Sequence, residues 1–166
     1  FLKYAYSQMN LFNQDKIVHT ASRTEFILNK LKAYGLNMYE NRYIQEWLQL
    51  DRFDPLADME VLHTLTNFMS TEPFIQRAYL INLRTRRVFD SQTGVVTFDA
   101  FGDGPMLKKV QEQQPLFLQF FPHEVEGVSH LALIVPSTPA KKDNRGYLVL
   151  LLDNQALQKD LLDQNK

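Results

Sequence analysis

The sequence predicts an α+β fold in which a long amino-terminal helix packs on an antiparallel sheet of about five strands. Two observations support this prediction. The first third of the 166-residue chain carries apolar residues at the three-to-four spacing of one helical face. The second half contains short runs rich in β-branched and aromatic residues, separated by turn residues. The length suits one folded unit, with a helical stalk and cap over 1–72 and a sheet core with a closing helix over 73–166.

The first expected helix is unusually long. Neither Gly nor Pro interrupts the chain from Phe1 to Tyr34, and Gly35 is expected to end the helix, because glycine is the favoured residue just after a helix. A helix of this length is a rod of roughly 50 Å. We therefore expect part of it to project from the domain or to pair with another chain.

Two further helices are expected before the sheet. The first of them covers about Asn37–Leu50. The other begins at Asp54-Pro55, because an aspartate side chain can accept hydrogen bonds from free helix amides and proline suits the first helical position. Pro73 is expected to end it.

The remaining chain is expected to form strands with one helix inserted between them. The expected strands and extended stretches are 75–83, 88–91, 95–98, 116–121, 128–135 and 147–152, with a helix over 105–113 and a closing helix over 154–162. Leu131–Val135 and Leu148–Leu152 are apolar without alternation, which is typical of strands that are covered on both faces. We therefore expect protein to pack on both sides of the sheet.

Composition and spacing argue against several classes of site. The absence of cysteine excludes disulfides, thiol catalysis and thiolate metal sites, and a formal net charge of −1 gives no overall attraction to nucleic acid. No nucleophile elbow or phosphate-binding glycine loop is present, and the loop Asp99–Gly104 suits a helix start better than a calcium loop. We expect no catalytic residue, metal, cofactor or bound nucleic acid. The four histidines lack zinc-helix spacing and are interpreted as ordinary, apart from His130: His19, His63, His123 and His130.

Two segments resemble the Cache family of PAS-like extracellular sensor domains. YLINLRTRRVFDSQTG (Tyr79–Gly94) resembles their hairpin, in which an apolar strand, a polar turn and a strand ending in Asp-Ser follow one another. GYLVLLLDNQALQKDL (Gly146–Leu161) resembles their closing strand, which ends in Asp before a helix that returns toward the membrane. More narrowly, the chain is similar to the ectodomains of membrane-bound AraC-type regulators and sensor histidine kinases of Gram-positive bacteria. The amino-acid-binding signature of one Cache branch is not evident, which leaves the ligand class open.

The resemblance implies an extracytoplasmic ligand-sensing domain that forms homodimers and is anchored in the cell membrane by two flanking helices. The chain begins at Phe1 without a Met, inside a helical pattern, so those helices are expected outside residues 1–166. The expected partner is a small-molecule ligand or an extracytoplasmic protein. Two alternatives remain open: a ligand-free dimerisation or protein-interaction ectodomain, and a soluble cytosolic PAS-like sensor.

Polar residues inside the expected strands are the candidate ligand-binding residues, because burying an unpaired polar group costs roughly 1–3 kcal/mol. Arg77 and Tyr79 share one strand face by the two-residue period, and His130 interrupts an apolar strand. Tyr147 opens the last strand. We expect these four residues to supply the polar groups of a mostly apolar pocket. The alternative is that Arg77 and Tyr147 lie at exposed strand ends.

Overall fold

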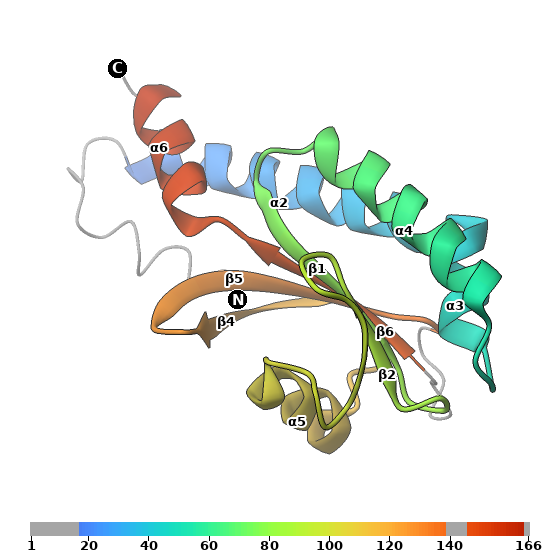
Figure 1. The fold of residues 1–166 in the computed structure, drawn as a ribbon. Helices are drawn as coiled ribbons and strands as arrows, with labels where there is room; N and C mark the ends of the chain where they lie inside the picture. Colours follow the sequence, from blue (N-terminus) through green and yellow to red (C-terminus); the bar gives the residue numbers. More distant parts are fainter. Residues whose placement is uncertain (1–16, 139–145, 165–166) are drawn as a thin grey trace.

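A computed structural model describes residues 17–138 and 146–164, and it consists of one sheet with helices on both faces (Figure 1). The described elements are α2 (Ile17–Tyr39), α3 (Arg42–Gln49), α4 (Pro55–Ser70), β1 (Ile75–Asn82), β2 (Arg87–Asp90), β3 (Gly94–Thr97), α5 (Gly104–Gln113), β4 (Gln119–Val125), β5 (Val128–Pro136), β6 (Gly146–Leu152) and α6 (Asn154–Gln164). The strands lie in the order β3-β2-β1-β6-β5-β4, and neighbouring strands are antiparallel. The predicted α+β class is confirmed.

The sheet has six strands in the described residues rather than about five. The short extended stretch expected over 95–98 is hydrogen-bonded to β2 along its whole length, and it therefore counts as the edge strand β3. The other edge strand, β4, lies further along the chain than the expected 116–121. Leu116 and Phe117 are exposed before it, and the strand continues through Pro122. Proline is tolerated there because an edge strand leaves one row of backbone groups unpaired.

Each face of the sheet carries its own apolar core. Leu133, Leu148 and Leu150 belong to the core beneath α2, α3 and α4, whereas Ile134 and Val149 belong to the core that α5 covers. Figure 1 shows the long helices on one side of the sheet and α5 on the other. Every residue of β6 is buried. The prediction that these apolar runs are strands covered on both faces is therefore confirmed.

The expected end of the first helix at Gly35 is wrong, because α2 continues to Tyr39. A Cβ atom at Gly35 would lie 2.9 Å from Cδ2 of Leu133, so this glycine lets the helix approach the sheet closely. The next helix starts at Arg42 rather than Asn37, where the Asn41 side chain accepts hydrogen bonds from the first free amides. Residues 1–16, which make up the first half of the expected long helix, lie outside the described residues.

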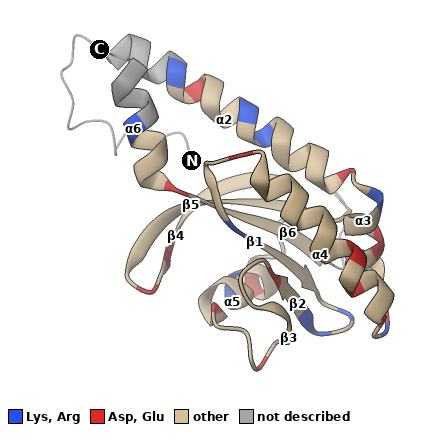
Figure 2. Cartoon of the chain, turned by 45° about the horizontal axis from the view of Figure 1, so that its top comes forward, with Lys and Arg blue, Asp and Glu red and all other residues tan. Residues whose placement is uncertain are grey.

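Asp54 begins a helix as predicted, and the loop 99–104 contains the start of another, as its sequence indicated. Asp54 accepts hydrogen bonds from the amides of Leu56 and Ala57 at the start of α4, and Asp103 accepts one from the amide of Met106 at the start of α5. Helices α2 and α4 lie side by side over the sheet (Figure 1, Figure 2). Among the helices of 17–138 and 146–164, none combines the length and the apolar character that a membrane crossing requires.

Candidate functional site on the α5 face of the sheet

The four predicted site residues lie on the same face of the sheet, the one that α5 covers. Arg77 of β1 pairs with Leu151 of β6, and Tyr79 pairs with Val149. Tyr79, Val149 and Leu151 pack in the core that α5 covers, so Arg77 lies on this face as well. His130 of β5 has the same parity as Ala132, whose side chain packs in this core, and Tyr147 packs there too. The side chain of Arg77 is 15% exposed and Tyr147 is 1% exposed, so the alternative that they lie at exposed strand ends is wrong.

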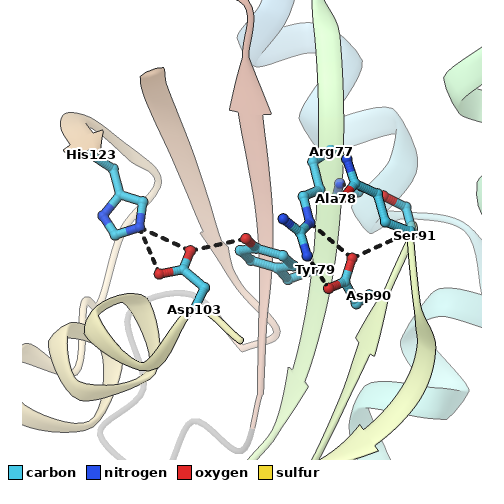
Figure 3. Close-up of polar contacts among 8 residues, drawn as sticks. Arg77, Ala78, Tyr79, Asp90, Ser91, Asp103 and His123 are labelled. Atoms are coloured by element: carbon cyan, nitrogen blue, oxygen red, sulfur yellow. Dashed lines mark hydrogen bonds and ion pairs between the residues drawn. The ribbon is translucent and has the colours of Figure 1, made fainter. Parts of the chain in front are cut away.

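Arg77 is held in place by a buried carboxylate on the neighbouring strand. Its Nε donates to Oδ1 of Asp90 at 3.0 Å and its Nη2 donates to Oδ2 at 2.5 Å (Figure 3). The hydrogen bonds that Arg77 donates to Asp90 raise the pKa of Arg77 above its already high value. The guanidinium also lies 5.3 Å from the centre of the Tyr79 ring, on which it stacks. A bidentate pair of this kind fixes the orientation of an arginine and leaves the N–H groups of Nη1 and the second N–H of Nη2 as donors.

A second polar cluster lies beside this pair and connects three elements. The Tyr79 hydroxyl donates to Oδ2 of Asp103 at 2.9 Å, and Nε2 of His123 lies 2.9 and 3.0 Å from the two carboxylate oxygens (Figure 3). Asp103 is 3% exposed and also caps α5. This one carboxylate therefore joins β1, β4 and the start of α5.

The pKa values of this cluster favour a structural role. Burial alone would raise the pKa of Asp103, but its hydrogen bonds and the charge of His123 outweigh burial, and the pKa lies below its usual value. Burial, followed by the neighbouring Asp103 carboxylate, raises the pKa of Tyr79 far above its usual value. Asp103 is therefore ionised and Tyr79 protonated near neutral pH, so the tyrosine serves as a hydrogen-bond donor rather than as a base.

A small cleft of ≈170 Å³ opens at the edge of this face, and its walls include Arg77, His130 and Leu151. His130 is 7% exposed, and its Nδ1 is buried with no hydrogen-bond partner in the part of the chain that the structure describes. The remaining lining residues are Gln76, Gln92, Val125, Glu126 and Val128. Tyr79 and Tyr147 do not line the cleft, because both are packed in the core behind it. The structure thus places two of the four predicted residues, Arg77 and His130, at one cavity.

Sequence reasoning missed Asp90, Asp103 and His123. A signal for His123 was present, since Phe121, His123 and Val125 alternate onto one face of β4. It was lost because the strand was expected to end at Phe121. No group of three or more histidine, cysteine, aspartate or glutamate side chains within 17–138 and 146–164 is arranged to hold a metal ion.

No protein-family model matches the chain, and no curated protein sequence matches it. Solved structures do match. One is a domain of a protein described as a member of the sensory box/GGDEF family from Vibrio parahaemolyticus, with 12% identity, a TM-score of 0.63, and coverage of 89% of this chain and 61% of that chain. Another is the extracellular domain of vpHK1S-Z8, a protein named as a histidine kinase, with 12% identity, a TM-score of 0.65, and coverage of 89% of this chain and 58% of that chain.

A third match is the ligand-binding domain of the Campylobacter jejuni chemoreceptor Tlp3 in complex with L-valine, with 14% identity and a TM-score of 0.62. The alignment covers 96% of this chain and 66% of that chain, so the chain spans about three fifths to two thirds of the structures that it resembles. At this identity the likeness establishes the fold. The chain has the Cache-like, PAS-like fold of extracellular sensory domains, as its two sequence segments predicted.

Proposed function

We propose that the chain is the extracytoplasmic ligand-sensing domain of a membrane-anchored bacterial signalling protein, either an AraC-type regulator or a histidine kinase. The fold supports a sensory role, because two of the solved structures described above are by name the extracellular domain of a histidine kinase and the ligand-binding domain of a chemoreceptor. In this proposal the membrane helices flank residues 1–166, the domain lies on the extracellular side, and two copies form a homodimer. The helical part, 1–72, is the stalk and cap, and 73–166 is the sensor core.

The observation that carries the proposal is the pairing of Arg77 and His130 in one cleft. Arg77 is oriented by Asp90 and retains a free donor edge, while the buried Nδ1 of His130 has no partner among the described residues. Leaving such a group unpaired costs about 1–3 kcal/mol, and a ligand that bonds to it recovers this cost. The ligand therefore carries an acceptor for Arg77 and a hydrogen-bonding group for His130.

The cleft also limits the size of the ligand. Ordinary small-molecule pockets measure roughly 300–1,000 Å³, and this one is ≈170 Å³. Small amphoteric molecules, such as the L-valine of the Tlp3 complex, offer both kinds of hydrogen-bonding group within a small volume. In this proposal a ligand contacts β1 through Arg77 and β5 through His130, and it binds one of two conformations of the sheet more tightly than the other. This difference in affinity shifts the equilibrium between the two conformations, and the stalk helices transmit the change.

Thermal unfolding tests the proposal. The purified chain is heated with each of the twenty L-amino acids and with acetate, lactate and succinate. A ligand at 100 times its Kd adds about 2.7 kcal/mol, which raises Tm by roughly 5–10 °C for a domain of this size. His130→Ala and Arg77→Ala should remove the shift. His63→Ala, which replaces an exposed histidine on α4, should leave it intact. A stabilising compound that acts equally on His130→Ala would place binding elsewhere.

The small volume of the cleft also favours a second candidate, a ligand-free dimerisation or protein-interaction ectodomain. Tyr79 and Tyr147 fill the centre of the α5 face, where a larger ligand would otherwise lie. Light scattering coupled to size-exclusion chromatography separates the two functions. A stable dimer with no thermal shift from any compound supports the second candidate, whereas a thermal shift that depends on His130 supports the first.

A further inference from the structure

A second hollow lies among helices α2, α3 and α4, on the opposite side of the molecule from the cleft that Arg77 and His130 line, which we call the Arg77 cleft. It measures ≈350 Å³, which is within the range of small-molecule sites. We name it the amide groove, because three asparagines line it together with aromatic and threonine side chains. Its lining residues are Tyr34, Asn37, Asn41, Tyr43, Thr64, Asn67, Phe68 and Thr71.

The groove is built from two facing stripes. Tyr34, Asn37 and Asn41 are spaced three and four residues apart, and so are the residues that α4 contributes from Thr64 to Thr71. This spacing keeps Tyr34 and Asn37 on one face of α2 and the second set on one face of α4 and its C-cap, while Asn41 joins the groove from the start of α3. The Tyr34 hydroxyl bonds to Oγ1 of Thr71 at 2.7 Å and donates to the carbonyl oxygen of Phe68. Because these bonds tie α2 to α4, the groove is already formed without a ligand.

The lining carries no charge. Residues 33–39 of α2 and 61–70 of α4 contain no Lys, Arg, Asp or Glu, and Figure 2 shows tan ribbon, the colour of uncharged residues, along both stretches. The hydrogen-bonding capacity comes from amides instead. Oδ1 of Asn41 is used to cap α3, which leaves its NH₂ group available. The side chains of Asn37 and Asn67 have no hydrogen bond to any residue that the structure describes.

The aromatic residues supply an apolar surface beside these amides. The rings of Tyr34 and Phe68 meet edge to face with centres 6.0 Å apart, and Tyr43 is 38% exposed at the rim. The Arg42 guanidinium lies 5.7 Å from the centre of the Tyr43 ring and is itself paired with Glu46, so this ring is supported from outside the groove. The groove therefore combines apolar ring surface with groups that both donate and accept hydrogen bonds.

We propose that the amide groove binds a neutral, hydroxyl-rich ligand, namely a sugar of one or two rings. Sugar hydroxyls donate and accept at once, as the side-chain amides do, and the C–H face of a sugar ring packs on aromatic rings. A charged ligand would lose its hydration without gaining a counter-charge from the lining. The site differs in this respect from the Arg77 cleft, and the inference does not depend on the proposed sensing function. The bound sugar is either a free molecule or the end of a glycan chain.

Saturation-transfer NMR on the 166-residue chain tests the proposal with D-glucose, D-galactose, maltose and cellobiose as probes. At least one probe should show transfer. Asn37→Ala and Asn67→Ala should each weaken its affinity by about three- to tenfold, because each removes neutral hydrogen bonds to the sugar. Both residues are exposed, so the melting temperature should not change. Tight binding of disaccharides alone points to a glycan chain, and equal binding of monosaccharides points to a free sugar.

Matched controls separate the groove from the rest of the helices. Asn29 on α2 and Thr66 on α4 are exposed and lie outside the groove, so Asn29→Ala and Thr66→Ala should keep full affinity. Arg77→Ala should also keep it, since that residue belongs to the other site. The proposal is overturned if none of the four sugars shows transfer, or if a sugar binds the Asn37→Ala/Asn67→Ala double variant as tightly as the unaltered chain.

Discussion

Replacing Asp103 with alanine tests how strongly one carboxylate holds the α5 face together. The side chain accepts hydrogen bonds from the Tyr79 hydroxyl, from the His123 ring and from the amide of Met106. Alanine removes all three acceptors at once. It leaves two buried side-chain groups unpaired, and it leaves α5 without its cap.

The expected loss can be built up from these contacts. A lost helix cap costs about 0.5–2 kcal/mol, and each buried group left unpaired costs about 1–3 kcal/mol. Because one carboxylate serves all three partners, the terms overlap and do not simply add. We expect a decrease of about 3–5 kcal/mol in the free energy of unfolding, which lowers Tm by roughly 6–20 °C. Asp103→Asn keeps an acceptor for the cap and should lose less.

Urea unfolding followed by circular dichroism measures this loss. Asp99→Ala is the matched control, because Asp99 is exposed in the same loop and its replacement should change stability by less than about 0.5 kcal/mol. If Asp103→Ala costs no more than Asp99→Ala, the buried cluster does not stabilise the fold and the reasoning fails. If Asp103→Asn is as damaging as Asp103→Ala, charge rather than hydrogen bonding is responsible.

The same carboxylate sets a pH dependence. Its pKa is lower in the folded chain than the unfolded value of about 3.9, so its contribution is complete above that value and is lost as pH falls through the folded pKa. The urea midpoints of the unaltered chain and Asp103→Asn should therefore converge below about pH 4, and a constant difference down to pH 2 would contradict this. Gly146→Ala should be more destabilising than Gly35→Ala. The new methyl group at residue 146 meets the fixed carbonyl oxygen of Ile81 at 2.9 Å, whereas the one at residue 35 meets a movable methyl group of Leu133 at 2.9 Å. We expect a loss in the free energy of unfolding of about 2–4 kcal/mol for Gly146→Ala and under about 2 kcal/mol for Gly35→Ala, and equal losses of Tm would count against the argument. Arg87 bonds both oxygens of Asp58 at 3.1 Å, so a double-mutant cycle with Arg87→Met and Asp58→Ala should give a coupling of about 1–3 kcal/mol, and additive losses would show that the pair is not coupled.

Elements with strong local signals were predictable from the sequence. Asp54-Pro55 begins α4 because capping depends only on the residues that follow it, and the apolar runs of β5 and β6 identify a sheet covered on both faces. Gly35 misled the prediction, because glycine serves equally well at a helix end and at a close contact. Only the distance to Leu133 on the sheet distinguishes these two uses.

The candidate site was predictable in part, for a similar reason. Strand parity alone places Arg77 and Tyr79 on one face of β1, and His130 was recognised because it interrupts an apolar strand; that Arg77 and His130 share a face follows only from the pairing of β1 and β5 with β6. The partners of Tyr79 and His123 depend on Asp103, which lies 24 and 20 residues away from them along the chain. No local pattern gives such a contact, because it depends on how α5 crosses the sheet. The aromatic residues Tyr79 and Tyr147 looked like pocket residues in sequence, but both are core residues that support the cleft.

The position of β6 in the sheet has a consequence for how the chain folds. β6 pairs with β1 on one side and with β5 on the other, so the three strands β1–β3 and the pair β4–β5 are connected through it. During synthesis these two parts leave the ribosome first and cannot be hydrogen-bonded to each other until residues 146–152 emerge. Pairing partners this distant along the chain slow folding, since a long loop must close first. A nascent chain that stops before Gly146 would hold two unjoined sheets, each with an unpaired edge available to other chains.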